Sequence, residues 1–202
     1  MDLVSRQEIV LRQRRELAEL AGLETRNKFE IMGSDGAQIG FAAEQGSGFG
    51  ATLARMFLGH WRTFEIHVFD TARQLVLVAE HPWRLWFQRL EIRTPDGRAL
   101  GALQQRFSLL YKRFDVEDAL GAARMRVASP LWKPWTFPFE RDGRDVAFVR
   151  KKWSGLMKEA FMDADNFKIE LVDPSLTEDD RMLILAAGLF IDLQYFERKA
   201  DN

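Results

Sequence analysis

The chain begins with a segment in which apolar side chains recur at roughly helical spacing. Charged residues, among them Arg12 and Glu19, fall largely between the apolar positions. Apolar residues three to four positions apart are typical of an amphipathic helix. The pattern therefore predicts a helix from Leu3 to about Leu20. Residues 1–22, which contain this helix, are expected to precede a single domain of residues 23–202. The apolar positions are Leu3, Val4, Val10, Leu11, Leu17, Leu20 and Ala21.

After residue 22 the period of the apolar pattern changes to two, and turn-forming residues follow at short intervals. Such alternation between Gly, Pro and Asp turns is typical of half-buried strands. About twelve segments qualify, and a sheet of that size closes into a barrel or splits into two layers. A short helix is predicted for residues 51–61. The predicted strands cover residues 28–31, 38–42, 63–69, 74–79, 84–93, 98–104, 106–114, 122–128, 135–140, 145–152, 156–161 and 167–171.

One segment near the C-terminus, from Met182 to Phe196, is apolar almost throughout. As a helix it would rise roughly 22 Å, which is short of the ~30 Å hydrocarbon core of a bilayer. Asp192 lies inside it, and a central carboxylate costs about 2.5 to 3.5 kcal/mol on insertion into a membrane. A helix that is apolar on all sides must be buried. The pattern favours a mostly β protein, a closed antiparallel barrel of about twelve strands around this helix; a single membrane span and conditional insertion are the alternatives.

Composition narrows the class of protein. With 202 residues and 47% hydrophobic content, the chain has material for one sizeable core. Its 29 Lys and Arg against 30 Asp and Glu provide no basic footprint for nucleic acid. It contains no cysteine, and its charged N-terminus lacks the apolar run of a signal peptide, so a cytoplasmic location is expected. The histidines lie on separate segments without zinc-site spacing, and no catalytic constellation stands out, so we expect no enzyme activity.

Six blocks of sequence, spread over nearly the whole chain, occur in the order found in one protein family. The chain resembles the phospholipid scramblase family, within the wider group that includes LURP-one and tubby-like C-terminal domains. The resemblance implies a twelve-stranded barrel around a central C-terminal helix. It also implies a lipid-facing function, which is Ca2+-dependent scrambling in the scramblases and phosphoinositide binding in tubby-like domains. The blocks are Gly22-Leu-Glu-Thr-Arg-Asn-Lys-Phe-Glu-Ile31, Phe41-Ala-Ala-Glu44, Arg62-Thr-Phe-Glu-Ile-His-Val-Phe-Asp70, Lys152-Trp-Ser-Gly155, Glu159-Ala-Phe-Met-Asp-Ala-Asp-Asn-Phe167 and Phe190-Ile-Asp-Leu-Gln-Tyr-Phe-Glu197.

From this resemblance we expect a scramblase-like protein that associates peripherally with membranes, binds anionic phospholipid and moves phospholipids without covalent catalysis. The alternative is a soluble tubby-like barrel that serves as a phosphoinositide- or protein-binding scaffold. Its oligomeric state is left open. The chain departs from the scramblases where their acylated, cysteine-rich stretch is replaced by Leu85, Trp86, Phe87 and Leu90. Without acylation, stable anchoring requires another device.

In the scramblase family, the block that begins at Asp163 opens a proposed EF-hand-like Ca2+ loop. The resemblance makes Asp163, Asp165, Phe167 and Ile169 its ligand positions here. An EF-hand needs Gly at its sixth position and Glu at its twelfth, and this chain has Lys168 and Pro174 there. Two interpretations follow. One is a weak, millimolar-class Ca2+ site, the only cofactor expected; the other is a turn between two strands.

Several groups of cations are candidates for binding acidic headgroups. Each cation near an anionic surface contributes about 1 kcal/mol. Because the net charge is close to zero, a solvated strand face with interspersed acids is the alternative for each group. One group is Arg12, Arg14 and Arg15 on the predicted first helix, and another is Arg84, Arg89 and Arg93 around Trp83 and Trp86. The residues predicted to bind lipid are Arg150, Lys151, Lys152 and Lys158, together with Trp61 and Arg62 at the end of the predicted helix 51–61.

Overall fold

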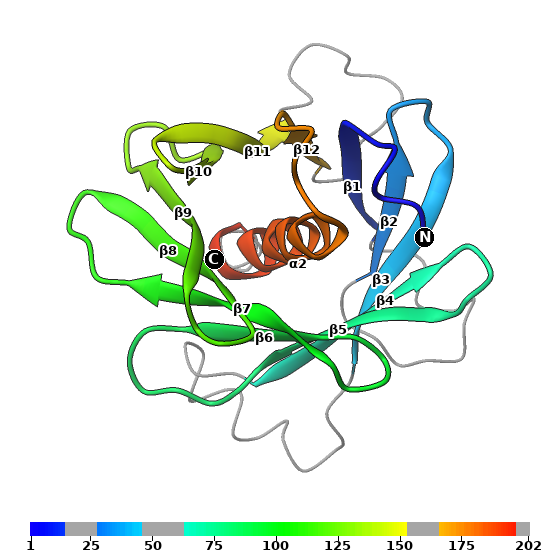
Figure 1. The fold of residues 1–202 in the computed structure, drawn as a ribbon, viewed down its shortest axis with the longest axis horizontal. Coiled ribbons are helices and arrows are strands. Elements are labelled where there is room, and N and C mark those ends of the chain that lie inside the picture. Colours follow the sequence, from blue (N-terminus) through cyan, green and yellow to red (C-terminus); the bar gives the residue numbers. More distant parts are fainter. Residues whose placement is uncertain (15–27, 46–62, 153–165, 197–202) are drawn as a thin grey trace.

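A computed structural model describes residues 1–14, 28–45, 63–152 and 166–196 of the chain. Within these residues twelve antiparallel strands form a closed barrel, in which each strand pairs with the next in sequence and the first pairs with the last (Figure 1). The predicted closed barrel is confirmed. The strands are β1 (Glu8–Arg14), β2 (Lys28–Gly33), β3 (Gln38–Gln45), β4 (Phe64–Asp70), β5 (Leu75–His81), β6 (Arg89–Arg93), β7 (Ala99–Arg106), β8 (Tyr111–Asp118), β9 (Ala123–Pro130), β10 (Thr136–Arg141), β11 (Arg144–Lys152) and β12 (Asn166–Leu171).

The predicted N-terminal helix is wrong for residues 8–14, which form β1. β1 pairs with β2 on one side and with β12 on the other, so it closes the barrel. Its buried residues alternate, with Ile9, Leu11 and Gln13 facing inward. The two neighbouring strands saturate the backbone of this short segment, and that gain outweighs a local helical pattern. Residues 3–7 of the predicted helix form a turn and irregular structure, so the prediction is wrong there as well, and the part from residue 15 lies outside the described residues.

The other eleven barrel strands overlap segments that were predicted as strands. Residues 156–161 and the predicted helix 51–61 lie outside the described residues. Two predicted strands were too long at one side. The strand predicted from residue 84 begins only at Arg89, and the strand predicted from residue 106 begins at Tyr111. The intervening residues connect the strands, and Phe87 there adopts a left-handed backbone conformation with φ 52°.

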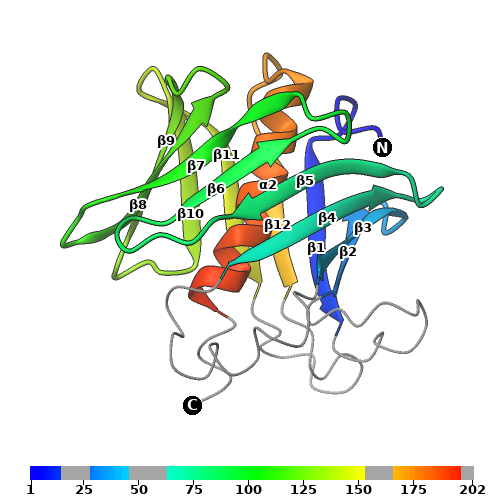
Figure 2. The same ribbon diagram turned by 90° about the horizontal axis from the view of Figure 1, so that it is seen from below.

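Helix α2 (Glu178–Tyr195) runs through the barrel (Figures 1 and 2) and is buried on all sides from Asp180 to Gln194. Thr177 caps it, because its Oγ1 accepts a hydrogen bond of 3.2 Å from the Asp180 N–H and its own N–H donates to Asp180 Oδ2. A Cβ at Gly188 would lie 3.0 Å from Cδ1 of Leu11 and of Ile169, so the helix approaches β1 and β12 closely. The predicted central helix is confirmed.

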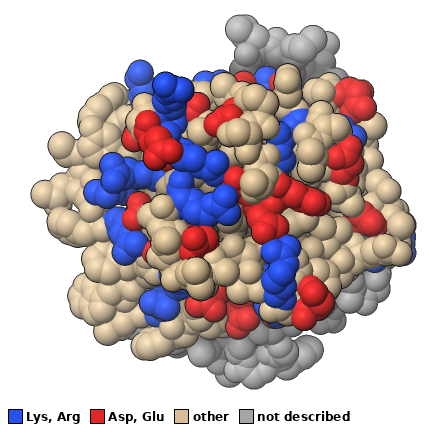
Figure 3. Space-filling view, viewed as in Figure 1, with Lys and Arg blue, Asp and Glu red and all other residues tan. Residues whose placement is uncertain are grey.

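Two buried charges hold the first turn of α2 in the barrel. Asp180, with no exposed surface, lies 3.1 Å from Arg124 Nη2 on β9 and 2.9 Å from Arg141 Nη2 on β10. The guanidinium of Arg181 donates to the carbonyl oxygens of Leu3, Arg6 and Leu176. Figure 3 shows the end of the barrel at which α2 begins, where basic and acidic side chains are interleaved.

The two ends of the barrel differ in their connections. In the orientation of Figure 2, the upper end carries tight turns and the connection from β12 to α2. The opposite end, which we call the lower end, carries the end of α2 at Tyr195 and the connections from β5 to β6, β7 to β8 and β9 to β10, which lie at the left of Figure 2 because these strands are tilted. The strand ends that border the undescribed segments 15–27, 46–62 and 153–165 lie at the lower end as well.

Candidate functional site

The structure separates two members of the predicted basic cluster. Arg150 and Lys151 are neighbours on β11, and successive side chains of a strand point to opposite faces. Arg150 lies outside the barrel, ion-paired with Glu170, with its guanidinium carbon 4.3 Å from the centre of the Phe148 ring. Lys151 points inward. The side chain of Lys152 and the whole of Lys158, Trp61 and Arg62 lie outside the described residues.

The outer face around Arg150 is a ladder of alternating charges. Lys168 on β12 contacts Glu8 on β1 at 2.6 Å and Glu170 at 3.2 Å. Its hydrogen bond to Glu8 raises the pKa of Lys168, with a smaller contribution from the bond to Glu170. Glu170 also pairs with Arg150. This arrangement matches the alternative interpretation of the basic run, a mixed-charge strand face.

Lys151 and Lys112 meet a group of aromatic rings where α2 ends. Lys151 Nζ lies 4.5 Å from the centre of the Phe196 ring, and Lys112 Nζ on β8 lies 4.6 Å from that of Tyr195. Trp135 stacks on Phe196 with centroids 5.4 Å apart. The carbonyl end of a helix is negative, and α2 has no basic residue in its own last turn. The two lysines, supplied by strands, therefore complement the helix terminus and the ring faces.

Of the predicted Ca2+ ligand positions, Phe167 and Ile169 lie in β12 with their side chains buried in the core. Asp163 and Asp165 lie outside the described residues. In the described part of the chain, no three His, Asp or Glu side chains come together in a way that would hold a metal ion. The Ca2+ site stays a prediction, and any such site would take no side-chain ligand from the inward face of β12.

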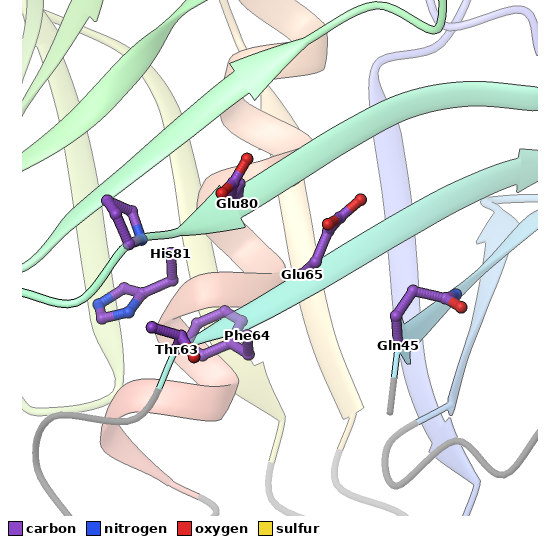
Figure 4. A pocket seen from close by; sticks show the side chains of 7 residues that line it. Gln45, Thr63, Phe64, Glu65, Glu80 and His81 are labelled. Atoms are coloured by element: carbon purple, nitrogen blue, oxygen red, sulfur yellow. The ribbon is translucent and has the colours of Figure 1, made fainter. Parts of the chain in front are cut away.

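A pocket of about 250 Å³ opens beside the lower ends of β4 and β5 (Figure 4). The rings of Phe64 and His81 stack there with centroids 4.7 Å apart. Glu65 and Glu80 lie directly opposite each other on the two strands, and Glu65 also contacts His67 at 2.5 Å. Two facing carboxylates suit a cationic group rather than a phosphate. The pocket is lined by Gln45, Thr63, Phe64, Glu65, Glu80, His81 and Pro82.

Large apolar side chains are exposed on the three described connections of the lower end. Trp86 is 73% exposed between β5 and β6, Leu109 is 78% exposed between β7 and β8, and Trp132 is 64% exposed between β9 and β10. We call the whole set the apolar rim. It consists of Trp83, Leu85, Trp86, Phe87, Phe107, Leu109, Leu110, Tyr111, Leu131 and Trp132.

Hydrogen bonds and ring contacts join the three connections into one surface. The Gln88 N–H donates to the side-chain oxygen of Gln105 at 2.9 Å, and the Gln105 N–H donates to the Gln88 carbonyl at 2.8 Å. These two bonds link the first connection to the end of β7. The Leu131 N–H donates to the Leu110 carbonyl at 3.1 Å. Tyr111 packs edge-on against Trp132 with centroids 5.8 Å apart. The rim is therefore continuous from β5 to β10.

The charged residues in the three stretches that carry the rim are all basic. Residues 82–88, 106–113 and 131–135 contain no Asp or Glu. By contrast, an aspartate occurs in or next to several tight turns of the upper end, including Asp35, Asp96, Asp118 and Asp142. The cations of the three lower stretches are Arg84, Arg106, Lys112, Arg113 and Lys133.

Sequence reasoning found only part of this surface. It singled out Trp83 and Trp86 with Arg84, but assigned Leu109 to a strand. An apolar run such as Phe107-Ser-Leu-Leu110 reads the same whether it is buried or exposed. The sequence signal that was available is the absence of acidic residues from all three stretches.

Comparison with known proteins places the chain in a family. The sequence model of the Scramblase family matches residues 1–198. The chain is 30% identical to phospholipid scramblase 1 of Homo sapiens over 94% of its own length and 63% of that protein, so it spans less than two thirds of this relative. It is 30% identical to phospholipid scramblase 2 of Bos taurus, covering 94% of the chain and 68% of the relative. It is 22% identical to the altered inheritance rate of mitochondria protein 25 of Saccharomyces cerevisiae, covering 94% and 70%. No solved structure matches the chain, and the expected likeness to tubby-like domains stays a prediction. With the family model covering almost every residue and the predicted barrel present, this chain belongs to the scramblase family.

Proposed function

We propose that this protein binds phospholipid bilayers and moves phospholipids between their leaflets, without covalent catalysis. The observation that carries the proposal is the match of the Scramblase family over residues 1–198, together with relatives named phospholipid scramblases. Because the chain spans only 63% of the human relative, the activity of the longer protein is extended to this chain as a proposal. The partner surface is an anionic phospholipid membrane, contacted peripherally from the cytoplasm.

The position of α2 supports a peripheral mode of action. None of the described helices is long and apolar enough to cross a bilayer. The sequence left a membrane span open as an alternative for the segment from Met182 to Phe196, but this segment fills the barrel. Withdrawing it would expose Asp180 and Arg181, which the barrel satisfies with ion pairs and hydrogen bonds. Lipid movement in this proposal therefore depends on surface contact and not on insertion of α2.

The experiment that tests the proposal uses the full chain and unilamellar vesicles that carry a fluorescent phospholipid. Dithionite bleaches only the outer leaflet, so scrambling activity raises the bleached fraction above that of protein-free vesicles. Co-sedimentation with the same vesicles measures binding separately. The proposal would be contradicted if the protein neither binds the vesicles at low salt nor raises the bleached fraction, whether or not Ca2+ is present.

A weak Ca2+ site at Asp163 and Asp165 is a separate part of the proposal. Low ligand count and the missing Gly and Glu positions imply millimolar affinity. Calorimetric titration compares the wild type with Asp165→Ala. Heat of binding that Asp165→Ala removes supports the site, and no heat in either protein removes calcium from the proposal.

A further inference from the structure

We propose that the apolar rim is the surface by which this protein docks on an anionic phospholipid membrane, with its aromatic rings in the interfacial layer. The inference rests on the proposed function, because it names the part of the molecule that meets the lipid. It extends the sequence-based candidate around Trp83 and Trp86 to two further connections, and it differs from the candidates at residues 150–158 and 61–62. It also fixes which end of the barrel faces the bilayer.

The exposed apolar side chains of the described residues are concentrated on the rim. Of the thirteen large hydrophobic side chains exposed among the described residues, ten belong to the rim. The other three lie apart from the rim: Val4 precedes β1, and Leu120 and Val172 lie on connections of the upper end. Scattered exposed apolar residues are normal, but a contiguous patch marks an interaction surface.

The chemistry of the rim selects a membrane as the occupant. Trp and Tyr favour the membrane interface because an apolar ring carries a polar edge, and the rim contains Trp83, Trp86, Trp132 and Tyr111. Leu109 and Leu110 extend between them with wholly apolar side chains. Basic residues beside such rings are typical of surfaces that lie in the headgroup layer.

The cations in the three stretches that carry the rim fall into two groups. Arg106 bonds to Asp115 and Glu117 on β8, and Lys112 turns inward to Tyr195. The remaining cations of these stretches are Arg84, Arg113 and Lys133, one from each stretch. No acidic residue occurs in the same stretches, so the surface complements an anionic headgroup layer. A protein partner would have to match the same combination of rings and positive charge, which makes the lipid surface the better fit.

The strands below the rim make it a fixed platform. β6 to β10 form consecutive antiparallel pairs. The Gln88 hydrogen bonds join the first connection to the end of β7, and the Leu110 and Tyr111 contacts join the second connection to the third. Binding therefore requires little ordering of the rings, which lowers its entropic cost. The chain has no cysteine for S-acylation, so a device of this kind supplies the contact that a lipid anchor would supply.

The test compares two matched variants of the full chain. The rim variant carries Trp86→Ser, Leu109→Ser and Trp132→Ser, and the control variant carries Leu120→Ser and Val172→Ser. All five side chains are more than half exposed, so both variants are expected to unfold at the wild-type temperature. Binding is measured by co-sedimentation with vesicles of phosphatidylcholine containing phosphatidylserine, at low and high salt.

We expect the rim variant to lose at least about tenfold in vesicle affinity, since three large apolar groups no longer leave water, while the control variant binds like the wild type. Replacing Arg84, Arg113 and Lys133 with Gln should lower the preference for phosphatidylserine over pure phosphatidylcholine vesicles. In vesicles with brominated acyl chains, tryptophan fluorescence of the wild type should be quenched more than that of the rim variant.

The possible failures are distinguishable. If the wild type binds vesicles and the rim variant binds equally well, the docking surface is elsewhere and this inference is overturned while the proposed function stands. If the wild type binds no vesicles, the proposed function itself fails. A wild type that does not bind lipid but dimerises in sedimentation experiments, with a monomeric rim variant, would make the rim an interface between copies of this chain.

Discussion

The guanidinium of Arg181, in the first turn of α2, donates a hydrogen bond of 3.0 Å to the carbonyl oxygen of Leu3, 178 residues earlier in the chain. The same side chain also reaches the carbonyl oxygens of Arg6, at 2.6 Å, and Leu176, at 3.1 Å, and only 5% of Arg181 is exposed. One buried cation thus ties the segment before β1 and the loop before α2 to the helix. Hydrogen bonds to a charged donor are stronger than neutral ones, so this residue holds the helix in the barrel.

Replacing this cation should destabilise the fold. Arg181→Met keeps much of the side-chain volume but leaves three carbonyl oxygens without their donor, and we expect a loss of about 2 to 4 kcal/mol in the free energy of unfolding. Urea denaturation measures it. The control is Arg126→Met, at an exposed position of β9, with an expected change below about 0.5 kcal/mol. Equal stability of the two variants would show that the buried arginine does not secure the helix.

Acid should weaken the contact between Arg98 and the start of α2. Hydrogen bonds from Arg98 are the main reason that the pKa of Asp179 is lowered, with bonds of 2.9 and 3.1 Å. A group whose pKa is lower in the folded state stabilises the fold above its unfolded pKa and loses this effect as the pH falls through the folded pKa. Asp179→Asn should therefore melt below the wild type near neutral pH.

The melting-temperature difference between the wild type and Asp179→Asn should then shrink as the pH falls below the ordinary aspartate value of 3.8. Because the side chains of Arg98 and Asp179 are 54% and 36% exposed, the difference should be small and should decrease in high salt. Arg98→Gln removes the partner and keeps the carboxylate, so it serves as the matched variant. A difference that persists unchanged at about pH 2 would contradict the assignment.

Gly101 should tolerate no side chain. It lies on β7 with φ 151°, and a Cβ there would lie 2.0 Å from the carbonyl oxygen of Glu117 on the paired strand β8. We expect Gly101→Ala to cost about 3 kcal/mol, since the clash is with backbone that must shift. Gly36→Ala is the control, because Gly36 has φ 76° and open space around it. That change should cost only about 1 to 2 kcal/mol, the ordinary penalty of a left-handed residue.

Arg150 should contribute little to the binding of anionic vesicles. Its ion pair with Glu170 already satisfies the charge, whereas an unpaired cation at a membrane surface contributes about 1 kcal/mol, or roughly fivefold in affinity. We expect Arg150→Gln to change vesicle affinity by less than about twofold. Glu170→Gln removes the paired acid and should raise the affinity. A fivefold loss in Arg150→Gln would restore the basic run on β11 as a principal lipid site.

The elements of the fold followed closely from the sequence. The alternation of apolar residues in segments such as Phe167–Leu171 predicted strands, because a half-buried strand must bury every second side chain. The segment from Met182 to Phe196 predicted a buried helix, because an apolar surface on all sides has to be removed from water. Neither inference requires knowledge of which elements become neighbours. The six blocks of sequence that resemble the scramblase family could also be recognised without the structure.

The assignments that depended on neighbours could be decided only by the tertiary structure. Glu8–Arg14 is a strand because β2 and β12 lie on either side of it, and its own spacing also fits a helix. Arg150 is neutralised by Glu170, twenty residues later, across a strand pair. The apolar rim exists because barrel closure brings Trp86, Leu109 and Trp132 to one end while burying other side chains of the same kind. The sequence by itself determined which side chains need burial. Exposure and the assembly of distant loops into one surface depend on long-range pairing, which a local pattern does not contain.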